Sequence, residues 1–204
     1  KAQFHTIASR PLQYKVEIVK DRPKSETVNV KDSLAMVGKK EKSIDKEKWL
    51  ERYMSVSLPL KRIKVTSPFG MRKDPFTGKK KMHNGIDLRA RNDEVYAMFP
   101  GMVKKVGYDK RSGNYVTLQH GDYTVSYCHL SRVTVKEKTP VLAGDVVGIT
   151  GNTGRGTGEH LHINLRKNNE YVNPECAFQY ISNILERWII LSLNTVPKKH
   201  HVKI

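Results

Sequence analysis

Short β-like runs separated by turn residues fill the middle of this 204-residue chain, from about residue 60 to residue 175. The runs recur at regular spacing, which is typical of an all-β unit. Between two of them, Gly121-Asp122 has the pattern of a two-residue hairpin turn, in which glycine supplies the positive φ. The predicted strands span residues 95–99, 102–108, 115–120, 123–130, 146–150 and 161–166.

The residues before this β region have a different texture. Residues 1–57 mix β-like stretches, such as residues 14–19, with prolines and polar breaks. A helical pattern of apolar residues follows Ser43, which is a residue type preferred at helix N-caps. Pro59 closes that pattern. We therefore place a domain boundary near residue 58 and treat residues 1–57 as an N-terminal segment of unknown role.

After the β region, Pro174 introduces a second helical pattern. Phe178, Ile181, Leu185 and Trp188 recur at helical spacing and form one apolar stripe. We expect this stripe to pack on the β domain rather than to bind a partner. The predicted organisation is a β domain over residues 58–182, followed by a C-terminal helical extension and tail over residues 183–204.

Composition and charge limit the class of protein. Hydrophobic residues make up 38% of the chain, which is too much core material for a disordered protein. No apolar run approaches the roughly 18 residues that a membrane-spanning helix needs, so we expect no membrane span. Two cysteines exclude a disulfide-rich scaffold and a four-cysteine metal site. The formal charge of +17 predicts attraction to a polyanion, either nucleic acid, anionic lipid or an anionic cell-wall polymer.

Histidines and one aspartate form the first chemical constellation. His83 and Asp87 are four residues apart, and Gly85 between them favours a turn that enters a strand. His160 and His162 are two apart on a predicted strand, so both imidazoles point to one face while the residue between them points away. A further histidine, His129, ends another predicted strand. His120 beside the hairpin turn is interpreted as structural, and His5, His200 and His201 as solvated.

This set has the residue types of a catalytic zinc site, which uses three protein ligands and leaves a position for water. His83, Asp87 and one member of the pair at 160 and 162 satisfy that count. Water bound to such a metal has a pKa near ~7 and is a nucleophile at neutral pH. The two remaining histidines are then available to take its proton and to stabilise charge on the attacked carbonyl.

Several further motifs occur in a fixed order around these residues. They are Ser67-Pro-Phe-Gly-Met-Arg72, Asp74-Pro-Phe-Thr-Gly78, His83-Asn-Gly-Ile-Asp87, Tyr127-Cys-His-Leu-Ser131, Gly144-Asp-Val-Val-Gly148, Gly151-Asn-Thr-Gly154 and Thr157-Gly-Glu-His-Leu-His162. Together they closely resemble the lysostaphin-type (LytM, β-lytic) zinc metallopeptidases over roughly residues 60–177. The ordered series is highly specific.

The resemblance implies a mainly β fold: an antiparallel sheet or sandwich with a groove across it, the duplicated hybrid motif fold. It implies one Zn²⁺ per chain, with His83, Asp87 and His162 matching the family's metal ligands. His129 and His160 match its two catalytic histidines that do not bind the metal. Glycines 151, 154, 156 and 158 precede His160 and are expected to form a loop that walls the groove.

Three positions depart from the family pattern. Cys128 stands where a small residue is usual, and strand alternation predicts that it is buried on the face opposite His129. Glu159 places a charge beside His160. Asn164 replaces an acidic residue two positions after His162, so one contact to that histidine is expected to differ.

The family's usual substrate is the peptide part of peptidoglycan, so the resemblance implies a metalloendopeptidase that cuts stem or cross-link peptides. It favours a D-Ala to diaminopimelate bond over a glycine bridge. An extracytoplasmic location follows from that substrate, with a leader removed before Lys1, and a monomer is favoured.

Two other classes of function are considered. The first is an inactive scaffold of the same fold that binds wall or activates a hydrolase. Such proteins typically lack one or more metal ligands, and all of them are present here. The second is a nucleic-acid binder, but the chain has no recognition helix, RNP motif or aromatic platform.

Overall fold

The computed structural model describes residues 46–193, with side chains described for residues 50–192. The expectations for residues 14–19, for Ser43 and for the tail from residue 194 lie outside these described residues. In chain order the elements are α2 (Lys46–Met54), β1 (Val65–Ser67), β2 (Gly70–Lys73), β3 (Lys80–His83), β4 (Ile86–Arg89), β5 (Glu94–Tyr96), β6 (Gly101–Asp109), β7 (Gly113–His120), β8 (Tyr123–Val133), β9 (Pro140–Val141), β10 (Val146–Thr150), β11 (His160–Lys167), β12 (Glu170–Val172) and α3 (Glu175–Leu193).

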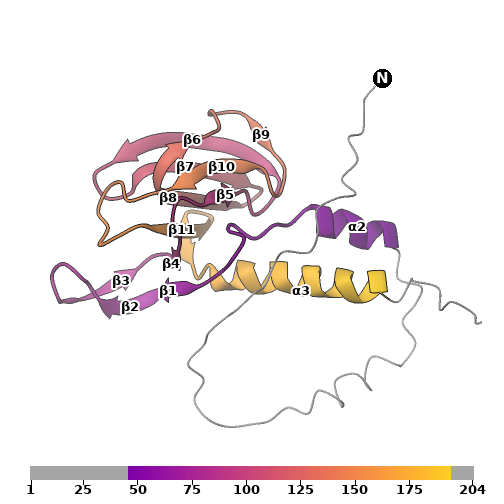
Figure 1. Ribbon diagram of the computed structural model, residues 1–204, viewed down its shortest axis with the longest axis horizontal. Coiled ribbons are helices and arrows are strands. Elements are labelled where there is room, and N and C mark those ends of the chain that lie inside the picture. Colours follow the sequence, from indigo (N-terminus) through magenta and orange to yellow (C-terminus); the bar gives the residue numbers. More distant parts are fainter. Residues whose placement is uncertain (1–45, 194–204) are drawn as a thin grey trace, which may run out of the picture.

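Ten of the described strands form one antiparallel sheet (Figure 1). Its main path runs β1-β4-β11-β8-β7-β6-β9, with β10 paired to β5 and β8, and β12 paired to β11. Strands β2 and β3 pair only with each other and form a hairpin that projects from one end of the sheet in Figure 1. The predicted mainly β, antiparallel class of the domain is confirmed.

The predicted strands correspond to β5, β6, β7, β8, β10 and β11, and the bounds of β10 agree at both ends. The hairpin between β7 and β8 turns at Gly121, whose φ is +57°. Strand β5 is shorter than predicted. The residues that follow Tyr96 form hydrogen bonds with segments outside the strands instead. For example, Met98 O accepts a hydrogen bond from Ser57 N at 2.9 Å.

The core lies under one face of this sheet. Along β11, Leu161 and Ile163 are fully buried while the alternate residues are half-buried, as a two-residue period requires. Neighbouring β4 contributes Ile86 and Leu88 to the same core. On β4 and β11, which carry the predicted ligands Asp87 and His162, the alternation of side chains therefore separates an apolar face from a polar face.

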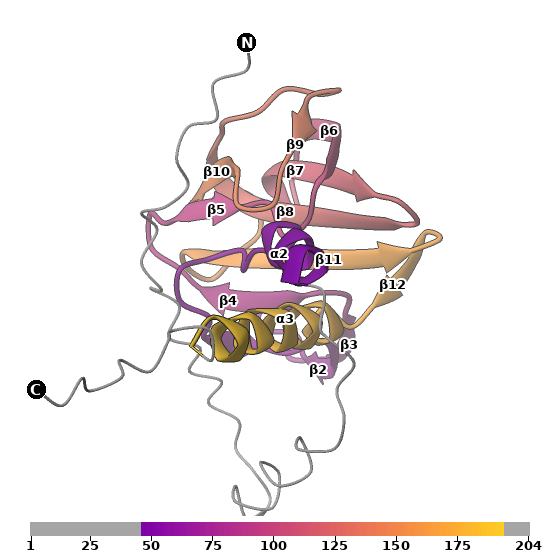
Figure 2. The same ribbon diagram turned by 90° about the vertical axis from the view of Figure 1, so that its right-hand side faces the viewer.

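Helix α3 crosses the end of the sheet next to β4 (Figure 2). Phe178, Ile181 and Ile184 from this helix belong to the buried core, so the predicted packing of its apolar stripe is confirmed. The helix is continuous across residue 182, and the domain limit placed there remains a prediction. Within residues 46–193, no helix combines the length and hydrophobicity needed to cross a bilayer.

The segment before β1 also belongs to the core. Val56, Leu58 and Leu60 are buried, and the predicted boundary near residue 58 falls among them. Tyr53 of α2 stacks on Trp188 of α3 with ring centroids 5.2 Å apart. The polypeptide that leads into the β domain is therefore held by packing on both sides of that boundary, whose position stays a prediction.

Replacing Ile181 with alanine is expected to lower the free energy of unfolding by about 2–5 kcal/mol, because its fully buried side chain joins α3 to the sheet. Ile190→Ala is the matched control on the same helix, since that side chain is 56% exposed, and it is expected to change stability by less than about 0.5 kcal/mol. Urea unfolding followed by circular dichroism measures both. Equal effects would contradict the packing of α3 described above.

Candidate metal centre and groove

The turn between β3 and β4 positions His83 and Asp87. His83 is the last residue of β3, and Asp87 is the second residue of β4. The predicted turn around Gly85 is confirmed, and there is a steric reason for a glycine at this position. A Cβ atom there would lie 2.4 Å from the backbone oxygen of Ile163. The chain therefore passes close to β11 at this point and brings both side chains beside it.

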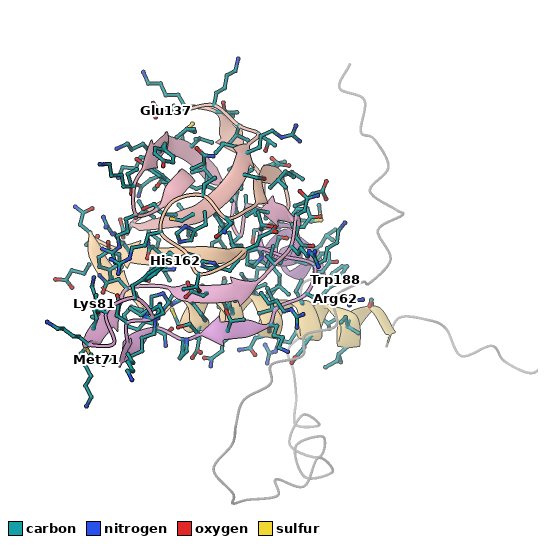
Figure 3. The ribbon with its side chains drawn as sticks, turned by 60° about the vertical axis from the view of Figure 1, so that its left-hand side comes forward. Arg62, Met71, Lys81, Glu137, His162 and Trp188 are labelled. Carbon is teal, nitrogen blue, oxygen red and sulfur yellow. The ribbon has the colours of Figure 1, made fainter. Side chains whose placement is uncertain are left out.

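Strand β11 supplies the other two histidines of the predicted set. His162 is paired in register with Asp87 on β4, and Leu161 between the histidines is fully buried in the core. His160 and His162 therefore share the polar face of the sheet, as their spacing predicted. Figure 3 places His162 in the middle of this face, beside the β2–β3 hairpin that carries Lys81.

His129 lies at a β-bulge in β8. Three residue steps separate Tyr127 from Leu130, but their partners on β7 are Val116 and Asn114, only two steps apart. The extra residue is accommodated by a φ of +63° at His129, an uncommon conformation for a residue with a side chain. The bulge turns the imidazole toward β11, where its ring centroid lies 4.6 Å from that of His160.

The bulge also corrects the prediction for Cys128. Burial is confirmed, because this residue is only 2% exposed. Its orientation was predicted wrongly: Cys128 pairs with His162 and lines the same groove as His129. Alternation fails here because the bulge inserts one residue. Burial raises the pKa of the thiol to about 12, so it stays protonated, and it is free of disulfide bonds, as is Cys176.

Three ligand-type atoms converge on this face. His83 Nε2 lies 3.2 Å from His162 Nδ1 and 3.3 Å from Asp87 Oδ1. A tetrahedral zinc ion with ligands at roughly 2.0–2.1 Å has ligand-to-ligand edges of about 3.3–3.4 Å. The third separation, from His162 Nδ1 to Asp87 Oδ1, is 2.6 Å, the length of a hydrogen bond. Two of the three separations therefore match the edges of a tetrahedral zinc site.

The outer ring nitrogens define which atoms are free to bind. His83 Nδ1 donates to Pro68 O at 2.7 Å, and His162 Nε2 donates to Asn164 Oδ1 at 2.9 Å. In the neutral rings the inner nitrogens then carry lone pairs that face each other and a carboxylate oxygen. Such a donor set repels itself unless a cation lies between its members. The residues present therefore fit a zinc ion held by His83, Asp87 and His162.

The two other histidines are oriented in a similar way. His129 Nδ1 donates to Thr153 O at 2.8 Å, and His160 Nδ1 donates to Gly158 O at 2.7 Å. Their Nε2 atoms are therefore the ones that carry lone pairs. His160 Nε2 lies 3.8 Å from Asp87 Oδ1, at the edge of the donor cluster. All five residues predicted from the sequence are thus brought together.

Burial and hydrogen bonds shift the acid–base equilibria of this cluster. Burial alone would raise the pKa of Asp87, but the adjacent imidazoles of His162 and His83 outweigh it and hold that pKa well below its usual range. Burial lowers the pKa of His129 to about 4, and repulsion from the neighbouring histidines adds to that effect. Asp87 is therefore ionised at neutral pH, while His129 is neutral and available as a proton acceptor.

An open groove of about 590 Å³ passes over this cluster. Strands β6, β7, β8 and β11 form its floor, and the β2–β3 hairpin forms one wall. Arg155, from the glycine-rich loop before β11, lines the groove, and Gly156 of that loop lies against His160. The glycine-rich loop therefore contributes to the groove lining through Arg155.

An ion pair joins this loop to the hairpin. Arg155 Nη2 lies 3.3 Å from Asp74 Oδ1, and the Arg155 guanidinium covers the Phe76 ring at 4.4 Å. Hydrogen bonds from the backbone N–H groups of Thr77 and Phe76 lower the pKa of Asp74. The two walls of the groove are therefore in direct contact.

The other sequence expectations have mixed outcomes. Glu159 points away from the groove, since its carboxylate accepts hydrogen bonds from Asn92 N and Thr150 Oγ1. Asn164 makes the predicted altered contact to His162. His120 lies apart from the cluster and donates to Pro100 O at 2.9 Å, in agreement with a structural role. His5, His200 and His201 lie outside the described residues.

One residue of the site was missed as a functional candidate. Arg72 of β2 places Nη2 3.4 Å from Asp87 Oδ2, the carboxylate oxygen that faces away from the histidines. The residue stands at the end of the Ser67–Arg72 motif, but the motif itself does not show which side chain it meets. A cation two strands earlier in the sequence becomes a neighbour of Asp87 only through the fold.

Comparison with known proteins places this arrangement in a family. Residues 81–174 match the model of Peptidase family M23. That stretch begins just before His83 and includes Asp87, His129 and both histidines of β11. The β domain of this chain belongs to peptidase family M23.

Several relatives resemble the M23 domain. Peptidoglycan DD-endopeptidase ShyC of Vibrio cholerae is 39% identical over 57% of this chain and 28% of its own length. A zinc-containing peptidase from Vibrio cholerae has a TM-score of 0.52 at 33% identity, over 59% of this chain and 38% of that chain. The catalytic domain of lysostaphin from Staphylococcus simulans has a TM-score of 0.53 at 27% identity, over 57% of this chain and 92% of that domain.

The family and these neighbours indicate a zinc cofactor for the M23 domain. The alignments also define the extent of the similarity. The chain spans about a quarter of the length of the curated relatives it matches. The similarity is therefore limited to one domain of each of these longer relatives.

Proposed function

We propose that this chain is a zinc metalloendopeptidase that hydrolyses peptide cross-links or stems of bacterial peptidoglycan. The observation that carries the proposal is the convergence of His83 Nε2, Asp87 Oδ1 and His162 Nδ1 on the floor of an open groove, beside two further histidines. The family match and the DD-endopeptidase relative support the same reaction.

In this proposal His83, Asp87 and His162 hold one zinc ion per chain. A zinc ion in such a site supplies a Lewis acid that polarises a carbonyl group and lowers the pKa of a water molecule to about 7. Asn164 and Pro68 keep the ligand histidines in the tautomers that present a lone pair to the ion. Arg72 holds the second oxygen of Asp87 and so restrains how that carboxylate turns.

His129 and His160 are the proposed catalytic histidines. Because each Nδ1–H already donates to a backbone carbonyl, each ring meets the substrate through Nε2. In its neutral form such an Nε2 accepts a proton from the attacking water. Once protonated, it donates a hydrogen bond to the oxyanion or passes its proton to the leaving amine. The low pKa of His129 keeps that ring in the accepting form before the reaction.

The substrate lies in the groove as an extended peptide, with its scissile carbonyl over the histidines. The DD-endopeptidase relative favours a D-Ala to diaminopimelate cross-link, because a glycine bridge contains no D-configured centre. Such a substrate places the protein outside the cytoplasm, and the chain acts as a monomer in this proposal.

Digestion of purified peptidoglycan tests the proposal. The zinc-loaded chain is expected to release new amino groups and no new reducing sugar ends, because it cuts amide bonds and leaves glycosidic bonds intact. The same protein treated with a chelator serves as the control and is expected to release neither. Reducing ends without amines would identify a glycosidase and overturn the proposal.

A further inference from the structure

The groove carries an excess of positive charge that the proposed catalysis does not use. Three carboxylates line it, those of Asp74, Asp87 and Asp109. Each is already engaged: Asp74 with Arg155, Asp87 with His162, and Asp109 with backbone N–H groups. The lining cations are Arg72, Lys81, Lys104, Lys105, Arg111, Arg155 and Arg166. Seven cations against three engaged carboxylates leave the groove positive.

Three of these cations line the groove from the strands of its floor, on opposite sides of it. Strand β6 has a bulge between Val103 and Lys105, whose partners on β7 are the consecutive residues Leu118 and Thr117. The extra residue, Lys104, breaks the alternation of side chains, so that both Lys104 and Lys105 line the groove. Arg166 on β11 lines it from the opposite side of the floor.

Uncharged side chains separate these two sides. One row of paired residues leads from Lys105 through Thr117 and Ser126 to Asn164. In the next row, Arg166 pairs with Thr124, which pairs with Gln119. These two rows offer hydroxyl and amide groups and no carboxylate.

The three cations have neutral partners within the described residues. Lys104 Nζ donates to Gln119 Oε1 at 2.9 Å, Lys105 Nζ lies 5.7 Å from the centre of the Tyr115 ring, and the Arg166 guanidinium covers Tyr171 at 4.2 Å. Glu137 and Asp109 attract Lys105 through space, but Glu137 accepts a hydrogen bond from Val106 N, and Asp109 accepts hydrogen bonds from two backbone N–H groups. These cations therefore keep their capacity to bind an anion.

Their distance from the proposed metal site sets the position of such an anion. Arg166 is four residues beyond His162 on β11, or about 13 Å at roughly 3.3 Å per residue. Asn164, in the row that ends at Lys105, is half as far. Lys105 lies three strands across the sheet from Asn164, or about 14 Å at roughly 4.8 Å per strand. An extended peptide with its scissile carbonyl over the histidines therefore reaches these cations with groups about four or more residues away.

We infer that the floor of the groove between Lys104 and Lys105 on one side and Arg166 on the other is a subsite for carboxylates of the substrate. The inference rests on the proposed function and narrows its substrate class to wall peptides with free carboxylates. Peptides in which those carboxyl groups are amidated present a neutral amide to the same cations. They lose the charge-assisted hydrogen bonds and bind more weakly.

A matched pair of cross-linked wall peptides tests the subsite, one with free carboxyl groups outside the scissile bond and one with the same groups amidated. The zinc-loaded chain is expected to cleave the free acid with a kcat/KM at least about tenfold higher. Lys105→Met and Arg166→Gln are each expected to reduce this ratio about three- to tenfold, mainly through the KM of the free acid. Lys136→Met removes the same charge from an exposed residue outside the groove and should leave the ratio unchanged.

Binding to the metal-stripped chain separates this inference from the proposed function. Fluorescence anisotropy with the two labelled peptides is expected to show the same preference for the free acid without cleavage. Cleavage of both peptides at equal rates would overturn the subsite and leave the peptidase proposal standing. Preferential binding with no cleavage by the zinc-loaded chain would support the subsite and overturn the peptidase proposal. A loss of selectivity in Lys136→Met equal to that in Lys105→Met would reduce the effect to net charge and also overturn the subsite.

Discussion

Replacing His162 with alanine is expected to remove bound zinc and peptidase activity together. The imidazole Nδ1 is one of three converging donor atoms, and His83 and Asp87 alone leave only two. We expect the zinc content to fall from about one per chain to near zero, and the release of amino groups from peptidoglycan to fall to the level of the chelator-treated protein. Elemental analysis of the purified variant and the amine assay measure the two effects.

Two control variants separate metal binding from general damage. His120→Ala removes a histidine that lies outside the site, and it should keep its zinc and its activity. Asn164→Ala removes only the partner of His162 Nε2, and a loss of about 10- to 100-fold in zinc affinity is expected. Full zinc occupancy in His162→Ala would refute the assignment of this residue as a ligand.

Removal of His129 or His160 is expected to have the opposite pattern, with zinc retained and turnover lost. Neither ring contributes to the set of three donor atoms, and both present Nε2 to the groove. Proton transfer by a positioned side chain accounts for about 10²–10⁴-fold in rate, so kcat should fall by that factor in each alanine variant. Single-turnover kinetics at saturating zinc measures it.

The double variant tests whether the two histidines act as a unit. If they handle the same proton in turn, removing both should cost little more than removing the more important one. Near-normal rates in both single variants would exclude these residues from the reaction. Loss of zinc from either variant would instead make that residue a ligand.

Much of this site could be predicted because its signals are local. The two-residue spacing of His160 and His162 on a strand determines that they share a face, and the glycine between His83 and Asp87 determines a turn. The apolar stripe of α3 likewise identified its buried side. In each case the pattern extends over only a few residues, so the local backbone conformation alone decides which way the side chains point.

The features that were missed depend on pairing between distant segments. The bulges at His129 and Lys104 each insert one residue into a strand, and only the register against β7 reveals them. Alternation therefore gave the wrong face for Cys128. The contact of Arg72 with Asp87 joins β2 to β4 across a turn whose path the sequence does not specify. The strand predicted over residues 95–99 ends early because residues before β1 bond to Met98.

The hydrogen bonds that orient the four histidines differ in whether they depend on the identity of the accepting residue. Pro68, Thr153 and Gly158 hold three of the rings through main-chain oxygens, which every amino acid possesses. Codon changes at those three positions leave the accepting atom in place so long as the backbone keeps its path. Only His162 relies on a side chain, that of Asn164. Position 164 is therefore the one orienting contact of the four that a single nucleotide change can remove without moving the main chain.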